Sequence, residues 1–251
     1  MSEFFSSIGD FFVGIKDDFI FNFIEDDRWK YVTEGFVNTI IITICAAVIG
    51  FIIGIVIAAI RSTYDKNAED YKRRGGAGAV IMKILNAVCK LYLTIIRGTP
   101  VLVQLLIMYF VVLVSMTNAV PVAIITFGIN SGAYVAEIFR GGIMAIDPGQ
   151  FEAGRSLGFN YIQTMRFIIV PQVFKNVLPT LCNEVIALLK ETSVCGYIAC
   201  MDITKGIYII IGRTYSYALP LAILAIVYLI LVMILTWLVG RLERRLRASE
   251  R

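Results

Sequence analysis

The chain contains stretches without a single charged side chain that are longer than a membrane is thick. No Asp, Glu, Lys or Arg occurs between Glu34 and Arg61, or between Arg213 and Arg241. About 20 apolar residues cross the hydrocarbon layer as a helix. Only 17% of the 251 residues are charged, against about 25% in an average soluble domain. The sequence therefore predicts an all-α, multi-pass membrane protein.

Further spans are predicted from a longer gap and from a weaker segment. The gap from Arg97 to Glu137 is about twice the length of one span, and TNAVP at 117–121 in its middle favours a turn. We therefore expect a helical hairpin there. One more span is predicted at about 174–199, although it carries Glu184, Lys190 and Glu191. The five expected transmembrane helices are about 35–60, 99–117, 120–140, 174–199 and 216–240.

The distribution of Lys and Arg predicts the orientation, because basic residues flank spans on the cytoplasmic side. Segment 61–98 has eight basic and three acidic residues, and segment 241–251 has five and two. Segment 1–34 has three and eight. The N-terminus is therefore predicted outside and the C-terminus in the cytoplasm. Five spans agree with this parity and place 141–173 inside and 200–215 outside.

The N-terminal segment is acidic, unlike a cleavable signal peptide. Its apolar residues recur at helical spacing. They favour either an interfacial helix on the outer surface or a stripe packed against the bundle. These residues are Phe4, Phe5, Ile8, Phe11, Phe12, Ile15 and Phe19.

Several kinds of chemistry are excluded by composition. The chain has no His, which removes His-based acid–base catalysis and His metal ligands. Its five cysteines form no Cys-x-x-Cys pair typical of structural zinc sites. We interpret them as small apolar packing residues and do not expect a disulfide between them. No phosphate loop of the Gly-x-x-x-x-Gly-Lys-Ser/Thr type occurs. If ATP is used, another chain must bind it.

The inside segment 141–173 is more elaborate than a chain reversal requires. Asp147, Pro148 and Gln150 form a predicted capping box with proline at the first helical position. This helix is expected to run to about Leu157 and to end at a left-handed Gly158.

A second short helix is predicted directly after that glycine. Asn160 and Gln163 repeat the capping arrangement, and Pro171 is expected to limit the helix. Two short capped helices would thus project from the inside face of the membrane.

The sequence EAGRSLGFNYIQTMRFIIVP, starting at Glu152, resembles the "EAA" signature of ABC importer permeases. That pattern is Glu-Ala-Ala, three residues, Gly, nine residues, Ile, one residue and Leu-Pro. Gly154 replaces the second Ala, and Val170 replaces Leu. The positions in register are Glu152, Ala153, Gly158, Ile168 and Pro171.

Three more segments resemble the polar amino-acid branch of that family, so that the resemblance covers about residues 35–245. They are LYLTIIRGTPVLVQLLIMYF at 91–110, GAYVAEIFRGGIMAI at 132–146 and LPTLCNEVIALLKETSV at 178–194. The resemblance implies a type I importer permease domain at 35–245 with a coupling loop at 147–171. Residues 1–34 would form an extracytoplasmic or interfacial segment, and residues 246–251 a cytoplasmic tail.

The resemblance also implies partners and a location. The subunit would pair with itself or a paralogue in a bacterial plasma membrane, among its lipids. Two ATPase subunits would bind ATP and magnesium, and an external solute-binding protein would deliver the amino acid. This chain itself would be no enzyme, would hold no cofactor or metal and would bind no nucleic acid. A stand-alone secondary transporter or channel is the alternative, but it has no need of such a docking loop, and a catalytic constellation for an intramembrane enzyme is not recognisable.

In the family the first short helix of the signature docks on the ATPase. Apolar Phe151, Ala153 and Leu157 would offer a face for docking, and small Gly154 would permit close approach. The expected coupling residues are Phe151, Glu152, Ala153, Gly154, Leu157 and Gly158.

Glu184 is the most unusual polar residue within a predicted span. It lies about ten residues, or roughly 15 Å, from the inside end near Lys175. A carboxylate near the bilayer centre should face the bundle interior or a wet cavity. It is a candidate for the substrate path together with Asn183, Asn130 and Ser131. The alternative is a structural role, either a hydrogen bond between helices or a pair with Lys190. Arg97 is favoured as a headgroup anchor or gate hinge over a substrate contact.

Overall fold

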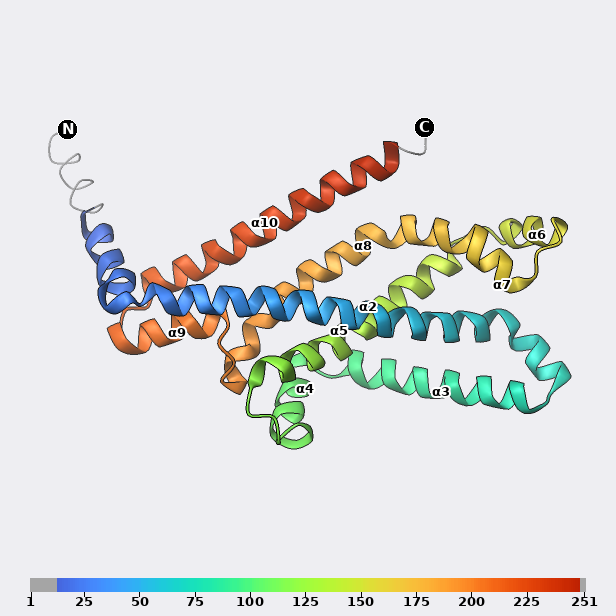
Figure 1. Cartoon of the computed structure of the whole chain (residues 1–251), viewed down its shortest axis with the longest axis horizontal. Coiled ribbons are helices and arrows are strands. Elements are labelled where there is room, and N and C mark those ends of the chain that lie inside the picture. The colour runs from blue at the N-terminus through green and yellow to red at the C-terminus, as the bar shows by residue number, and fades with distance from the viewer. Residues whose placement is uncertain (1–12, 249–251) are drawn as a thin grey trace.

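The computed structural model describes residues 13–248, which form a bundle of long helices (Figure 1). Part of the predicted N-terminal stripe, from Phe4 to Phe12, lies outside the described residues. Residues 13–19 are helical. The main helices are α2 (Trp29–Arg74), α3 (Ala77–Gly98), α4 (Val101–Ile107), α5 (Ala119–Met144), α6 (Pro148–Ser156), α7 (Tyr161–Thr164), α8 (Val170–Glu191), α9 (Ile203–Thr214) and α10 (Ala218–Ala248). Shorter π and 3-10 turns are Ile20–Ile24, Glu25–Asp27, Met108–Val112, Met165–Ile169 and Thr192–Ile198.

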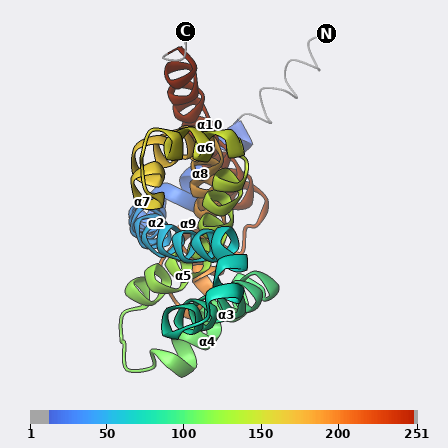
Figure 2. The same cartoon turned by 90° about the vertical axis from the view of Figure 1, so that its right-hand side faces the viewer.

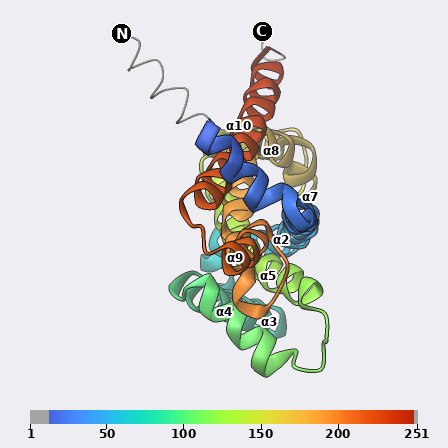
Figure 3. The ribbon, with the colours of Figure 1, turned by 90° about the vertical axis from the view of Figure 1, so that its left-hand side faces the viewer.

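The predicted all-α membrane architecture is confirmed. Among the described residues, α2, α3, α5 and α10 are long and apolar enough to cross a membrane. A fifth span results if Tyr161–Ile198 and Ile203–Thr214, which meet at a bend of 47°, count as one. The two end-on views place α6 and α7 at one end of the bundle (Figure 2) and α9 at the other (Figure 3).

The predicted position of the second span was wrong. Residues 61–98 are not a loop, because α2 continues to Arg74 and Ala77–Gly98 forms a membrane-length apolar helix, α3. The chain then breaks at Thr99 and Pro100, both in extended conformation. Val101–Val112 forms only a shorter apolar helix. The expected helix 99–117 is thus a break, a short helix and a connection.

One other expectation also needs correction. Pro171 does not limit a separate helix, because Tyr161–Ile198 runs as one helix through a π turn at Met165–Ile169. Pro171 lies at the start of α8, directly after this π turn, and the helix continues through it. Segment 200–215, predicted to lie outside, contains helix α9, one face of which is buried.

The most extensive packing in the bundle is between α2 and α5, and glycines make it possible. Gly50 and Gly54 on α2 face α5, and Gly128 and Gly132 on α5 face α2. A Cβ atom added at Gly128 would lie 2.6 Å from Cγ2 of Ile49, and one at Gly132 would lie 2.8 Å from Cγ2 of Ile53. Both pairs have the small-xxx-small spacing that lets membrane helices approach closely.

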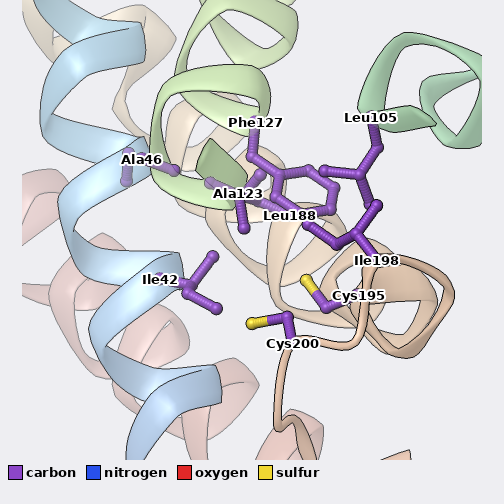
Figure 4. Close-up of a cluster of buried hydrophobic side chains, with 10 residues drawn as sticks. Ile42, Ala46, Leu105, Ala123, Phe127, Leu188, Cys195, Ile198 and Cys200 are labelled. Atoms are coloured by element: carbon purple, nitrogen blue, oxygen red, sulfur yellow. The ribbon is translucent and has the colours of Figure 1, made fainter. Parts of the chain in front are cut away.

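The largest buried cluster joins these two helices to α4, α8 and the turn after α8 (Figure 4). Ile42 and Phe127 are completely buried in it, as is Leu105 from α4. Cys195 and Cys200 lie within this cluster as free thiols. The short helix α4 is therefore anchored to the bundle although the chain is broken just before it.

We predict that Gly54→Ala lowers the melting temperature of the detergent-solubilised chain. The new Cβ would lie 2.6 Å from Cβ of Val135 and 2.9 Å from the backbone nitrogen of Ala136. Overpacking of this kind costs about 1–3 kcal/mol. Gly240→Ala is the matched control, because its Cβ would meet nothing within 4 Å. Equal melting temperatures of the two variants would contradict the packing argument.

Candidate functional site

The predicted loop 147–171 folds at the far end of α2. Asp147 caps α6 by accepting a hydrogen bond from the backbone N–H of Gly149 at 2.7 Å, and Pro148 begins the helix. The predicted reciprocal bond from Gln150 is not formed. Its Oε1 instead accepts a 3.3 Å hydrogen bond from Nε2 of Gln172. The cap is therefore correct, but the full box at this helix was a wrong expectation.

Gly158 ends α6 as predicted, with φ of +81°. Its N–H donates to the carbonyl of Arg155 at 2.9 Å, and the N–H of Phe159 donates to that of Gly154 at 3.0 Å. These two bonds form a Schellman motif, in which glycine tolerates the left-handed conformation best. The predicted capping box of Asn160 and Gln163 then starts α7.

Phe151 faces the protein rather than the surface. Its ring stacks on that of Tyr161, with centroids 6.5 Å apart, and Nζ of Lys66 lies 3.6 Å from its centre. Lys66 belongs to the extension of α2 beyond Arg61. A cavity of about 310 Å³ lies between α2 and the two short helices α6 and α7, beside this contact. The long α2 thus supports the loop through a cation–π contact.

Gly154 also acts within the loop. It is buried, and a Cβ there would lie 2.7 Å from Oγ1 of Thr164 on α7. The close approach that it permits is therefore between α6 and α7. Glu152, Ala153 and Leu157 are exposed, and Leu157 keeps 71% of its surface accessible. These three residues belong to the open surface of the loop.

Within the membrane-spanning part, Ser131 and Glu184 are brought together. The hydroxyl of Ser131 on α5 donates to Oε1 of Glu184 on α8 at 3.0 Å. Ser131 is buried and Glu184 is half-buried. Asn183, the residue before Glu184 on α8, is exposed and does not join this pair.

Asn130 contacts a different residue, Gln104, which the sequence interpretation did not single out. Pro100 has no N–H to donate to the carbonyl of Ile96. Nε2 of Gln104 replaces it at 2.8 Å and also lies 3.1 Å from the carbonyl of Thr99. Its Oε1 accepts from Nδ2 of Asn130 at 2.9 Å. Gln104 therefore satisfies the broken backbone and ties it to α5. The helix-breaking Pro100 was the one visible signal for such a partner.

We predict that Gln104→Leu destabilises the chain. The change leaves the carbonyl of Ile96 and the amide of Asn130 without these partners, and an unsatisfied buried polar group costs about 1–3 kcal/mol. Thermal unfolding in detergent measures the effect. Gln150→Leu is the control, because this glutamine is exposed on α6. A melting temperature of Gln104→Leu equal to that of the control would refute the assignment.

Among the described residues, no group of three His, Cys, Asp or Glu side chains is placed to hold a metal ion. The site is instead a capped loop at one end and polar pairs between helices. Residues 75–248 match the model of the family described as binding-protein-dependent transport system inner membrane component. The chain belongs to this family. It is accordingly a membrane-embedded permease subunit of ABC importer type, as the resemblance implied.

Relatives in this family include named amino-acid permeases. The putative glutamine transport system permease protein GlnP of Rickettsia bellii is 35% identical over 87% of this chain and 94% of its own. The arginine transport system permease protein ArtQ of Bacillus subtilis is 34% identical over 88% and 94%. The glutamine permease of Escherichia coli is 36% identical over 65% and 77%.

Solved structures agree with the fold. The crystal structure of an amino acid ABC transporter with histidines aligns with a TM-score of 0.74 and 37% identity, over 86% of this chain and 94% of that one. An inward-facing MetNI methionine ABC transporter aligns with a TM-score of 0.71 over 88% and 99%. At 18% identity, this second likeness shows the fold alone.

Proposed function

We propose that this chain forms the membrane path for a polar amino acid and couples it to ATP hydrolysis on partner subunits. The loop of α6 and α7 carries the proposal. Its helix caps, its Schellman turn and the cation–π contact of Lys66 with Phe151 fix the two short helices at the end of the bundle, where they present an exposed surface. Relatives named for glutamine and arginine transport support a polar amino acid as substrate.

In this proposal the ATPase docks on the exposed residues of α6. Glu152, Ala153 and Leu157 provide the contact surface. Phe151 and Gly154 act beneath it by fixing the helix to Tyr161 and Thr164. Gly158 sets the angle between the two short helices. ATP and magnesium belong to the partner, and this chain needs no cofactor.

A second permease subunit, identical or paralogous, is also part of the proposal. α10 leans away from the bundle (Figure 1), and only 6% of its most apolar stretch of 18 residues is buried within the chain. That surface is available to a second subunit or to lipid. The basic residues at the end of α2, between Arg61 and Arg74, and those of the C-terminal tail favour a cytoplasmic position for α6 and α7. The end with α9 then faces the external binding protein.

We predict that Gly158→Val abolishes ATP-dependent uptake without preventing membrane insertion. A β-branched residue at φ of +81° is strained, so the turn between α6 and α7 should change. Uptake of labelled glutamine and arginine by proteoliposomes containing the chain and its copurified ATPase measures the effect. Gly212→Val is the matched control, since it lies exposed on α9 with nothing within 4 Å.

Two results would reject the coupling proposal. One is full uptake by Gly158→Val. The other is failure of any ATPase subunit to copurify with the wild-type chain, together with uptake that does not require ATP. The second result would favour a stand-alone transporter.

Glu184 is the proposed polar residue of the path. A half-buried carboxylate at this depth is costly unless it is compensated, and Ser131 supplies one hydrogen bond to one of its oxygens. The remaining acceptor capacity is available for the amine or cationic group of a passing substrate. Asn183, exposed beside it, and Asn130 complete the candidate set.

We predict that Glu184→Gln keeps assembly but lowers uptake or changes the preference between arginine and glutamine. Gln can still accept the hydrogen bond from Ser131 but carries no charge. Uptake must be normalised to assembled complex. Ser131→Ala is the companion variant, because it removes the hydrogen bond and keeps the carboxylate. Unchanged rate and preference in Glu184→Gln, or a loss of assembly in both variants, would assign Glu184 a structural role.

A further inference from the structure

A cluster of charged side chains joins α2, α3 and α5. Oε1 of Glu137 accepts from Arg61 at 2.7 Å, and its Oε2 lies 3.1 Å from Arg140 and 3.8 Å from Arg97. Arg140 also lies 3.8 Å from Asp65. Glu137 is thus shared by three arginines, and a single carboxylate cannot satisfy three guanidinium groups.

A cavity of about 410 Å³ opens beside this cluster. Its lining includes Arg61, Lys90 and Arg97 but only one carboxylate, Glu137. Lys90 forms no salt bridge in the part of the chain that the structure describes. Nε of Arg61 is buried and has no hydrogen-bond acceptor there. The cavity therefore has excess positive charge, and it suits an anion.

The surface beside the cavity is apolar and accessible. Val88, Leu91 and Ile95 on α3 are 59%, 60% and 52% exposed. A molecule with a phosphate in the cavity could place hydrocarbon along this face. Arg and Lys side chains are the usual partners of phosphate oxygens.

We propose that the cavity lined by Arg61, Lys90 and Arg97 is a phosphate-binding site, filled by the headgroup of an anionic phospholipid or by a free phosphate. The site lies apart from the loop of α6 and α7 and from Glu184, and it does not depend on the proposed transport function. Arg61 and Arg97 are held by Glu137, so this part of the site is formed before the ligand arrives.

Lipid binding to the purified full chain, measured by native mass spectrometry in neutral detergent, tests the proposal. Dioleoyl phosphatidylglycerol should bind more tightly than dioleoyl phosphatidylcholine. Lys90→Gln should weaken phosphatidylglycerol binding about five-fold, the contribution of one basic residue near an anionic headgroup. Lys83→Gln is the matched control, because Lys83 is exposed on the same helix but does not line the cavity.

Added sodium phosphate distinguishes the two sources. If millimolar phosphate displaces the lipid, and its own binding requires Lys90, the occupant is a free phosphate. If phosphate does not compete, the lipid headgroup is the occupant. The proposal is overturned if Lys90→Gln binds phosphatidylglycerol as tightly as wild type, if Lys83→Gln loses as much, or if phosphatidylcholine binds equally well.

Discussion

The close contact between α2 and α5 is the constraint on which the rest of the bundle depends. Lipid surrounds apolar side chains as well as a neighbouring helix does, so helices in a membrane associate mainly through close packing and hydrogen bonds. Glycines spaced four residues apart on both helices supply that packing. With α5 held against α2, its other faces bind α8 and the short α4. The buried cluster around Phe127 forms where these helices meet.

The same α2 helix also connects the two ends of the molecule. Near its start, Gly35 packs against the backbone of Asp202, and Gly206 of α9 packs against the backbone of Tyr31. Near its other end, Lys66 lies over the ring of Phe151. Both contacts use one uninterrupted helix of 46 residues. The loop of α6 and α7 and the helix α9 therefore both contact this one helix.

Elements with local sequence signals could be predicted from the sequence. Elements whose apolar sequence is interrupted by charged residues, or whose place depends on tertiary contacts, could not. Charge-free gaps predicted α5 and α10, and turn residues predicted the cap at Asp147 and the ending at Gly158. α3 was missed because Lys83, Lys90 and Arg97 divide its apolar sequence. These residues recur every seven positions, so they share one face of the helix. Counting charges along the chain hides such a helix, whereas its periodicity would have revealed it.

The candidate site was predictable to a similar extent. Signature positions located the loop, but sequence could not tell that Gly154 contacts Thr164 rather than a partner. Glu184 and Ser131 were identified separately, and only the packing of α5 against α8 joins them. Gln104 was passed over because its partners, a broken backbone and Asn130, are defined by the fold. A side chain that hydrogen-bonds the free backbone groups at a helix break has no local sequence pattern by which it could be recognised.

The continuity of α7 and α8 gives a physical route between the two parts of the site. Tyr161 in the loop and Glu184 among the spans lie on one helix, with a π turn near its start. In the proposed coupling, a displacement of the loop is carried along the helix axis. Pro179 lies between them and donates no backbone hydrogen bond, so bending costs least there. Movement of Tyr161 should reach Glu184 as a change of tilt at Pro179, while α2 and α5, locked by their glycines, stay in place.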